Sequence, residues 1–484
     1  MSMSILTVNH SGKEPVKIEF EGNVKLSELL ESNDLMPPTP CGGNGKCGKC
    51  KAFLYQEGAE NAHSEILTCQ AMIEGNCEVF IPKSTIVSKI RTEGFMPEYK
   101  LDPVAAGYGV AVDIGTTTVV LRIINLDTGE ILPAVSVENP QRAIASDVIN
   151  RIQASLNGKS ALEQKMIQGT INSLFEQALK ENELTKEDIK AWVITGNTTM
   201  LYLYTGRSPL SLTKVPYTAD CTFGFEENGV YFPPCFGAYV GADIYTAILA
   251  SDLVHKPGIS MLIDLGTNGE LAIYKDGKLT CCATACGPAF EGTGIECGGP
   301  ATEGAIDHFW VENGEIKYSV IGDCEPTHMC GSAIIDAVAA LIKTGHVSDT
   351  GRLDTDQYFV SEKVYISKQD IRQIQLAKSA ICAGIITLME INDVKPEDVA
   401  RFYIAGGFGA YLKLESADTI DLIPKELINK ADVIGNAALS GAILTLLDKN
   451  AAESLKLDDC ECINLAATEQ FSDLYIENMI FNVD

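Results

Sequence analysis

The chain has 484 residues, 46% of them hydrophobic and 21% charged, which predicts two to four folded domains with sizeable cores. A formal net charge of −28 argues against binding to nucleic acid or to an anionic membrane surface, because both need clustered Lys and Arg. The chain has 16 cysteines, no basic and apolar leader and no apolar run of about 18 residues, so we expect a protein of the reducing cytoplasm that does not span a membrane.

Four cysteines near the N-terminus have the spacing of an iron-sulfur site. Cys41, Cys47 and Cys50 form a Cys-x5-Cys-x2-Cys pattern on a glycine-rich loop, and Cys69 supplies a fourth thiol. Glycines let the backbone approach a small cluster closely, and the arrangement resembles a [2Fe-2S] ferredoxin domain of the vertebrate and bacterial redox type. The alternatives are four structural cysteines or a zinc site, although zinc sites favour two short Cys-x2-Cys pairs and only one is present.

The residues around these cysteines predict a small β-rich domain. Residues 5–8, 16–20, 52–55 and 77–81 have the pattern of strands, and leucines at helical spacing predict a helix over 26–30. We therefore expect a β-grasp ferredoxin domain over residues 1–82. Residues 83–107 contain prolines and no clear period, so we expect a linker there.

The rest of the chain predicts a duplicated α/β unit. Asp113 ends an apolar strand and begins an Asp-x-Gly-Thr turn, and Asp264 begins a second such turn in the same context. The repeat extends further, because residues 184–196 and 394–406 both contain a helix-capping segment that leads into a strand ending in glycine. We expect a first subdomain over 108–258, a second over 259–484, and an insertion between about residues 281 and 369.

Several helices of this region have recognisable ends. Ser146 is expected to cap a helix over 147–156, and Ser160 with Glu163 predicts a capping box for a long helix that ends near Leu179. Residues 371–389 contain few helix breakers and predict a long buried helix. Another helix is expected to start after Gly435.

Two Asp-x-Gly-Thr turns that face one cleft suit a metal-bound polyphosphate. Asp113 and Asp264 are expected to hold Mg²⁺, directly or through water, while hydroxyl and glycine N–H groups bind phosphate oxygens. The order of the turns resembles the ATPase superfamily of acetate and sugar kinases, heat-shock chaperones and actin, which has an RNase H-like fold; the alternative is a pair of ordinary hairpin turns. The residues expected to contact ATP are Gly115, Thr116, Thr117, Thr118, Gly266, Thr267, Asn268, Gly287, Gly406, Gly407, Phe408 and Gly409.

Finer motifs resemble one family, the ATP-dependent reductive activators of corrinoid proteins. The motifs begin at Asn139, Ser146, Gly196, Val240, Asp264, Gly287, Cys330 and Gly435, so that the resemblance runs from Cys41 to Leu439. It implies a [2Fe-2S] cluster, ATP and Mg²⁺, and a one-electron reduction of the inactive Co(II) corrinoid protein of a methyltransferase system to Co(I). The chain has a shorter connector than larger members and no Cys-rich C-terminal motif, which leaves the path of electrons into the cluster open. A low-potential electron donor is implied, and a homodimer is one option.

Four further acids have two readings each. Asp147 and Asp243 belong to family-like motifs and are candidates to orient water or metal, but Asp147 is equally suited to the first turn of a helix. Glu270 and Glu291 have the same ambiguity. For the remaining cysteines, including Cys281, Cys282, Cys286 and Cys297, we expect buried structural roles, and for the six histidines structural or surface roles.

Other functions remain open at this point. A metabolite kinase with a fused redox sensor would use a free carboxylate in the cleft to take a proton from its substrate. An activator of 2-hydroxyacyl-CoA dehydratases uses the same ATPase fold, but it binds a [4Fe-4S] cluster between two subunits, and the attached four-cysteine domain argues against it. A simple electron carrier would show no ATP hydrolysis stimulated by a partner.

Overall fold

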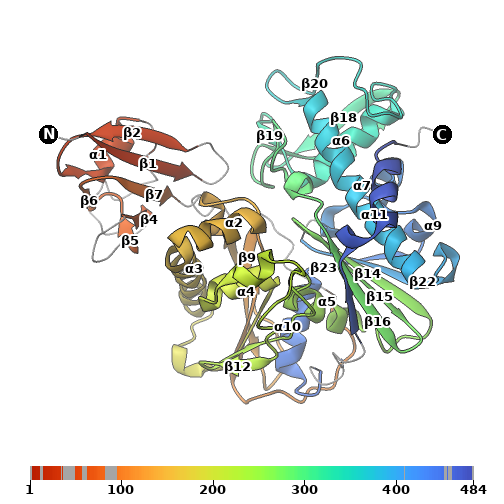
Figure 1. Cartoon of the computed structure of the whole chain (residues 1–484), viewed down its shortest axis with the longest axis horizontal. Coiled ribbons are helices and arrows are strands. Elements are labelled where there is room, and N and C mark those ends of the chain that lie inside the picture. The colour runs from red at the N-terminus through yellow and green to blue at the C-terminus, as the bar shows by residue number, and fades with distance from the viewer. Residues whose placement is uncertain are drawn as a thin grey trace.

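The computed structural model describes residues 3–10, 15–33, 35, 50–56, 63–81, 95–407, 409–451, 455 and 460–481. It consists of a small N-terminal sheet and two larger α/β halves that lie side by side (Figure 1). The expected boundary at residue 82 lies outside the described residues, as do Cys41, Cys47 and Phe408.

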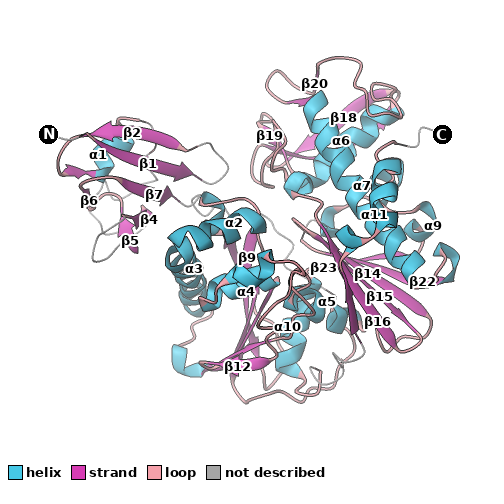
Figure 2. Ribbon diagram, in the orientation of Figure 1, coloured by secondary structure: helices cyan, strands magenta, loops and turns pink. Residues whose placement is uncertain are grey.

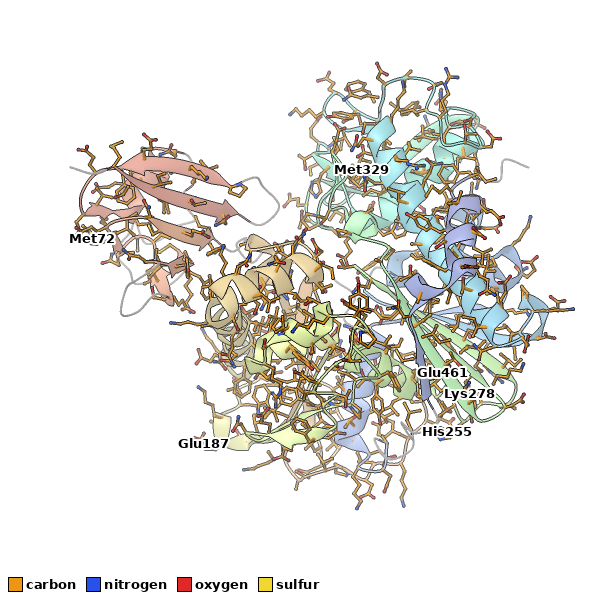
Figure 3. The ribbon with its side chains drawn as sticks, in the orientation of Figure 1. Met72, Glu187, His255, Lys278, Met329 and Glu461 are labelled. Carbon is orange, nitrogen blue, oxygen red and sulfur yellow. The ribbon has the colours of Figure 1, made fainter. Side chains whose placement is uncertain are left out.

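The N-terminal part is a five-stranded sheet in the order β2-β1-β7-β4-β5. Its strands alternate between a buried and an exposed face, so that Leu6, Val8 and Val79 meet the helix in one apolar core. Met72, labelled in Figure 3, lies exposed at one end of this part. The elements are β1 (Ser4–His10), β2 (Val16–Phe20), β3 (Val24–Lys25), α1 (Leu26–Glu31), β4 (Lys51–Tyr55), β5 (His63–Leu67), β6 (Met72–Ile73) and β7 (Cys77–Ile81).

The first α/β half is a mixed sheet in the order β10-β9-β8-β11-β13-β12. β8, β9 and β10 are antiparallel, and β11 then lies parallel to β8. The strands are apolar on both faces because helices cover both sides, as Figure 2 shows. The elements are β8 (Tyr108–Ile114), β9 (Thr118–Asn125), β10 (Val135–Glu138), η1 (Pro140–Ala143), α2 (Val148–Ala154), α3 (Ser160–Glu181), η3 (Lys186–Asp188), β11 (Ile189–Gly196), α4 (Thr198–Thr205), η4 (Pro209–Thr213), β12 (Phe225–Glu227), β13 (Val230–Phe232) and α5 (Ala242–Ser251).

The second half has the strand order β23-β22-β14-β15-β16-β24, in which the first five strands repeat the topology of β13-β11-β8-β9-β10 and β24 has no counterpart among the described strands of the first half. β14, β15 and β16 correspond to β8, β9 and β10, and β22 corresponds to β11. Lys278 and Glu461, labelled in Figure 3, form an ion pair where β24 joins β16. The elements are β14 (Ile259–Leu265), β15 (Gly269–Lys275), β16 (Lys278–Thr284), α7 (Lys368–Ile391), η6 (Pro396–Asp398), β22 (Val399–Ala405), η7 (Gly409–Tyr411), α8 (Leu414–Thr419), α9 (Lys425–Ile428), β23 (Ala431–Gly435), α10 (Ala437–Leu447), β24 (Cys460–Ile463), η9 (Leu465–Ala467) and α11 (Glu469–Glu477).

The second half also carries an inserted layer between β16 and α7, where the lengths of the two repeats differ. It holds a three-stranded sheet in the order β18-β17-β19, a helix and a two-stranded sheet. Its apolar core is continuous with that of the second sheet, since Ile306, Met329 and Ile335 belong to the same cluster as Ile263. The elements are η5 (Pro288–Glu291), β17 (Ala305–Glu312), β18 (Glu315–Val320), β19 (His328–Met329), α6 (Gly331–Lys343), β20 (Gln357–Phe359) and β21 (Tyr365–Ser367).

One helix of each half crosses toward the sheet of the other half. α10 packs on β8 and β11, while α5 contacts β14 and β15 as well as β11 of its own half, and the two helices pack on each other. The crossing is close at Gly441, where an added methyl group would lie 1.8 Å from the carbonyl oxygen of Thr246. The two halves are therefore joined by exchanged helices.

Two expectations about helix starts were wrong. Asp147, not Ser146, caps α2, because its carboxylate accepts a hydrogen bond from the N–H of Asn150 at 2.9 Å. Ser160 and Glu163 form no capping box, because Ser160 is already the first residue of α3 and Lys159 takes the N-cap position without a side-chain hydrogen bond. The chain kinks between α2 and α3 within η2 (Ser155–Lys159), at Asn157 and at Gly158, whose φ is +94°. Glu163 is fully buried instead.

One described helix, α7, has the length and apolar composition of a membrane span, and 78% of its most apolar stretch is buried inside the protein. It packs along β15 and β16. Its burial identifies it as a core helix of the second half.

Candidate functional site

A cleft of about 1110 Å³ lies between the two α/β halves. Both Asp-x-Gly-Thr turns line it: the first turn, residues 113–118, joins β8 to β9, and the second turn, residues 264–268, joins β14 to β15. Because the two sheets have the same topology, each turn stands at the same place in its own half. The duplication thus brings two equivalent polar loops to one cavity.

The first turn is tight. The N–H of Gly115 donates to the carbonyl of Thr118 at 2.9 Å, and a side chain at Gly115 would meet that carbonyl at 2.6 Å. In the second turn the N–H of Gly266 donates to the carbonyl of Asn268 at 3.1 Å. The threonine hydroxyls that follow are therefore presented from a compact backbone.

Glu291 connects the two turns. Its Oε2 accepts a hydrogen bond from Thr117 Oγ1, and another from Thr267 Oγ1 at 3.0 Å. The two hydroxyls are themselves 3.3 Å apart. A carboxylate from η5 thus lies at the junction of the two halves.

Four carboxyl groups line the same cleft; Glu270 is buried, and Asp113, Asp243 and Asp264 are half-buried. Burial raises the pKa of Asp113 to about 6, although a hydrogen bond from Asn436 acts in the opposite direction. Burial raises the pKa of Asp243 to about 7; a hydrogen bond from the N–H of Ile244 acts in the opposite direction, and the charge of Asp113 adds to the rise. Burial raises the pKa of Asp264 and Glu270 well above the usual range, and the neighbouring acids add to the effect.

These carboxyl groups fit a divalent cation. Each ionised carboxylate disfavours ionisation of its neighbours, and a bound cation would offset that repulsion. Within the described part of the chain, no three His, Cys, Asp or Glu side chains converge closely enough to hold a metal alone. A cation in the cleft would therefore take further oxygen ligands from phosphate or water, as Mg²⁺ commonly does.

The third glycine turn follows β22. The N–H of Gly406 donates to the carbonyl of Gly435 at 2.9 Å, and a side chain at Gly406 would lie 2.3 Å from the carbonyl of Leu265. Its φ of +100° also favours glycine. Gly406, Gly407 and Tyr411 line the cleft, whereas the predicted residues Gly287 and Gly409 do not.

Two asparagines of the site were not expected from the sequence. Asn436 donates to Asp113 Oδ2 at 2.9 Å, and Asn197 donates to Thr116 Oγ1 at 3.1 Å. Each caps a helix, and each follows a glycine at the end of a parallel strand. That shared Gly-Asn signal could have identified both.

The ambiguous acids now separate by position. Asp243, Glu270 and Glu291 line the cleft, whereas Asp147 caps α2 and does not. Arg142 lines the cleft as well, and its Nη2 donates to Thr293 Oγ1 in the other half at 2.7 Å.

In the N-terminal part, two of the four predicted thiols are described and lie together. Cys50 Sγ and Cys69 Sγ are 3.2 Å apart and buried. Burial raises the pKa of Cys50, but hydrogen bonds involving Cys69 and Thr68 outweigh it and leave the pKa below its ordinary value. Two thiols in contact, one of them biased toward thiolate, suit a shared metal centre.

The cysteines outside that group lie in apolar surroundings. Cys281 and Cys282 are fully buried on β16, and Cys286 is buried beside the second turn. Burial raises the pKa of all three thiols above its ordinary value.

Known proteins match the chain over most of its length. Residues 108–256 match the family described as RACo middle region, and residues 258–484 match the C-terminal domain of RACo, the ASKHA domain. The corrinoid activation enzyme RamQ of Eubacterium limosum is 34% identical over 441 residues, which cover 82% of this chain and 74% of that protein. The chain belongs to the family of ATP-dependent reductive activators of corrinoid proteins.

Two further similarities agree with this membership. A [Co(II) methylated amine-specific corrinoid protein] reductase of Methanosarcina barkeri is 24% identical over 418 residues, 76% of each chain. A solved structure, the reductive activator for corrinoid,iron-sulfur protein, is 27% identical, covers 98% of both chains and has a TM-score of 0.71. The two α/β halves therefore form an ASKHA ATPase fold, the family fold of actin and the sugar kinases.

Proposed function

We propose that this chain uses ATP to reduce the inactive Co(II) form of a corrinoid protein to Co(I), and so reactivates a corrinoid-dependent methyltransferase system. The observation that carries the proposal is the cleft in which both Asp-x-Gly-Thr turns meet, on a chain that also brings two N-terminal thiols into contact. Family membership supports the cobalt substrate, since the relatives named above act on corrinoid proteins.

The N-terminal part is, in this proposal, a β-grasp ferredoxin domain. Its [2Fe-2S] cluster would be held by Cys41, Cys47, Cys50 and Cys69, and the contact between the last two thiols supports that ligand set. A cluster of this kind gives or takes one electron at a time. The chain must then be recharged by a low-potential electron donor.

In the cleft, Asp113 and Asp264 would hold Mg²⁺, and Thr117 and Thr267 would donate to phosphate oxygens. Their position on opposite halves means that a bound polyphosphate would bridge the halves, as Glu291 does without it. Gly406 and Gly407 would offer backbone to the adenosine end, and Gly407 is exposed. Binding and hydrolysis of ATP thus change what holds the halves together.

ATP matters because the electron transfer is uphill. A gap of roughly 200 mV for one electron costs about 5 kcal/mol, since each 59 mV is about a factor of ten. A protein can offset such a cost only if its nucleotide states bind the Co(II) partner differently. We therefore expect the ATP-bound form to bind the partner in a way that removes or excludes an axial ligand of cobalt, and hydrolysis to release it.

The experiment uses the anaerobic, reduced full-length chain mixed with a Co(II) corrinoid protein of a methyltransferase system. Co(I) absorbance should appear only with MgATP, and should be lost in Asp264→Ala and in Cys69→Ala. Equal rate and extent of reduction without nucleotide would overturn the role of ATP.

The same mixture separates the other candidate functions. Phosphate release stimulated by the corrinoid protein supports an activator, whereas transfer of phosphate to a small metabolite would indicate a kinase. ATP hydrolysis with no Co(I) from any corrinoid protein would indicate a different redox partner.

A further inference from the structure

The N-terminal sheet is docked on the first α/β half through a small apolar contact (Figure 1). Phe53 and Phe80 of the sheet pack against Ala143, Leu162 and Met166. The five side chains are at most 7% exposed, so the contact excludes water. Apolar burial of this size stabilises a docked position, but it is small enough to be reversible.

Charges at the edge of this contact reinforce it. Lys159 Nζ lies 2.8 Å from Glu78 Oε2 of the sheet, and 5.2 Å from the centre of the Phe80 ring. Both side chains of the ion pair are partly exposed, so the pair adds little to the free energy of docking and mainly fixes the orientation of the sheet. The docking therefore has a defined orientation.

The segment that receives the sheet also holds the first turn. Asn139, at the start of the segment, donates its side-chain amide to the carbonyl of Gly115 at 2.8 Å and its N–H to the carbonyl of Thr117 at 2.7 Å. Ala143 and Ile144, at its end, contact the sheet. Residues 139–144, which include η1, thus span the whole distance between the two sites.

A buried arginine forms a second connection. Arg151 is fully buried, and its Nη2 donates to the carbonyl of Thr116 in the first turn at 2.7 Å. Its Nη1 lies 3.4 Å from Gln141 Oε1, and Gln141 Nε2 donates to the carbonyl of Glu163 at 3.0 Å. Glu163 directly follows Leu162, which contacts the sheet.

This connection contains a buried acid, Glu163, whose pKa burial raises to about 8 although Arg151 and Lys159 act in the opposite direction. Both carboxylate oxygens of Glu163 are buried, and neither has a hydrogen-bond partner among the residues whose placement is described. Arg151 supplies an opposite charge nearby and donates its own hydrogen bonds to neutral oxygens. Such an arrangement is costly for stability alone, which points to a role in the site it supports.

We propose that residues 139–144 and Arg151 are positioning residues that make the geometry of the first turn and the docking of the N-terminal sheet depend on each other. The sheet holds Ala143 and Leu162 in place, which fixes Asn139 and Arg151 behind the carbonyls of the turn. Because coupling between two sites is reciprocal, nucleotide bound at the turn changes the stability of the docked sheet by the same factor. The inference deepens the proposed function and rests on its assignment of ATP to the cleft.

The test measures MgATP affinity by calorimetry on the whole chain. Absorbance first establishes that the N-terminal cluster is intact in each sample. Phe53→Asp places a charge in the apolar contact without touching the α/β halves, and should weaken MgATP binding at least about fivefold, the lower end of typical coupling. The matched control is Val16→Asp, which puts the same charge on the far edge of the same sheet and should leave the affinity unchanged.

A double-mutant cycle then tests the route. In an Arg151→Lys background, which keeps the charge but loses the reach to Thr116, Phe53→Asp should change affinity by less than about twofold. Equal effects of Phe53→Asp in both backgrounds would overturn the role of Arg151. Affinity within about twofold of the unmodified chain in Phe53→Asp would overturn the coupling as a whole.

A second readout keeps the test independent of protein folding defects. MgATP should change amide hydrogen exchange in residues 51–55 and 159–166 of the unmodified chain, and should not do so in Phe53→Asp. Unchanged exchange on adding MgATP would contradict the inference. Neither measurement depends on cobalt reduction. A failure of the proposed function would therefore appear in the cobalt assay, and a failure of the coupling would appear in MgATP affinity and hydrogen exchange.

Discussion

The side-chain amide of Asn436 donates a hydrogen bond to Asp113 at 2.9 Å, although the two residues belong to opposite halves of the chain. The contact is possible because α10 crosses to the first sheet. The other atom of the same side chain, Oδ1, accepts the N–H of Leu439 at 2.8 Å as a helix cap. One asparagine therefore fixes a helix start and the orientation of an acid that lines the cleft.

Replacing this asparagine should affect both stability and the acid. Asn436→Ala removes a helix cap and should lower the free energy of unfolding by about 1 kcal/mol, measured by denaturant titration. It also removes the hydrogen bond that lowers the pKa of Asp113, so ATP hydrolysis should have its pH profile shifted upward. Asn436→Ser keeps a capping side chain but lacks the amide, so it should recover most of the lost stability but should not restore the pH profile of ATP hydrolysis. Recovery of both would contradict the role of Asn436 in setting the pKa of Asp113.

MgATP affinity should rise with pH. Burial raises the pKa of Asp113 to about 6 and that of Asp243 to about 7, so both are largely protonated at about pH 5.5 in the free cleft. A cation needs the ionised forms, so binding releases protons, and affinity should increase up to about pH 7.5 and then level off. Calorimetry in two buffers with different ionisation heats measures the release directly, and no proton release at about pH 6 would refute the assignment.

The same carboxyl groups should make the free protein less stable as the pH rises. Below about pH 4 they are protonated in both folded and unfolded chains, whereas between about pH 4 and pH 7 only the unfolded chain ionises them. The unfolded state then binds fewer protons than the folded state, so these groups make the free energy of unfolding fall as the pH rises over this range. Asp113→Asn should flatten that slope in denaturant titrations of the nucleotide-free chain.

Removing one thiol of the predicted cluster site should abolish the cluster. Cys69→Ser takes away one of two sulfurs that lie 3.2 Å apart, so the visible absorbance of a [2Fe-2S] centre should be lost. Cys77→Ala is the matched control, because Cys77 is a buried thiol of the same sheet that packs in the apolar core. Loss of absorbance in both variants to the same degree would favour a general folding defect over ligation.

The crossing of α5 and α10 should not tolerate a side chain at Gly441. Gly441→Ala places a methyl group 1.8 Å from the carbonyl of Thr246, so the helices must separate, at a cost of roughly 3 kcal/mol in the free energy of unfolding. In α3, Gly169→Ala meets only the flexible end of Glu65 at 3.3 Å and should be neutral or stabilising, because alanine favours helix. Thermal unfolding of the two variants compares them, and equal melting temperatures would contradict the packing argument.

The sequence by itself determined the repeat and the chemistry of the turns. Local signals carried this: an apolar strand ending in Asp113 or Asp264, a glycine at the turn, and hydroxyls after it, all within a few residues. The strand order of both sheets agrees with that duplication, because the same local order folds to the same topology twice. The long helix predicted over residues 371–389 is likewise a short-range pattern, and it is found as α7.

Tertiary structure decided what no short segment encodes. Whether Ser160 caps a helix depended on the preceding chain, which kinks at Gly158 and leaves Lys159, not Ser160, at the N-cap position of α3. Asn436 contacts Asp113, and Glu291 joins Thr117 to Thr267, only because the exchanged helices and duplicated sheets bring distant segments together. Burial has the same origin: Glu163 and Arg151 look like ordinary surface charges in the sequence, and they became interior groups because the N-terminal sheet, η1 and α3 close around them.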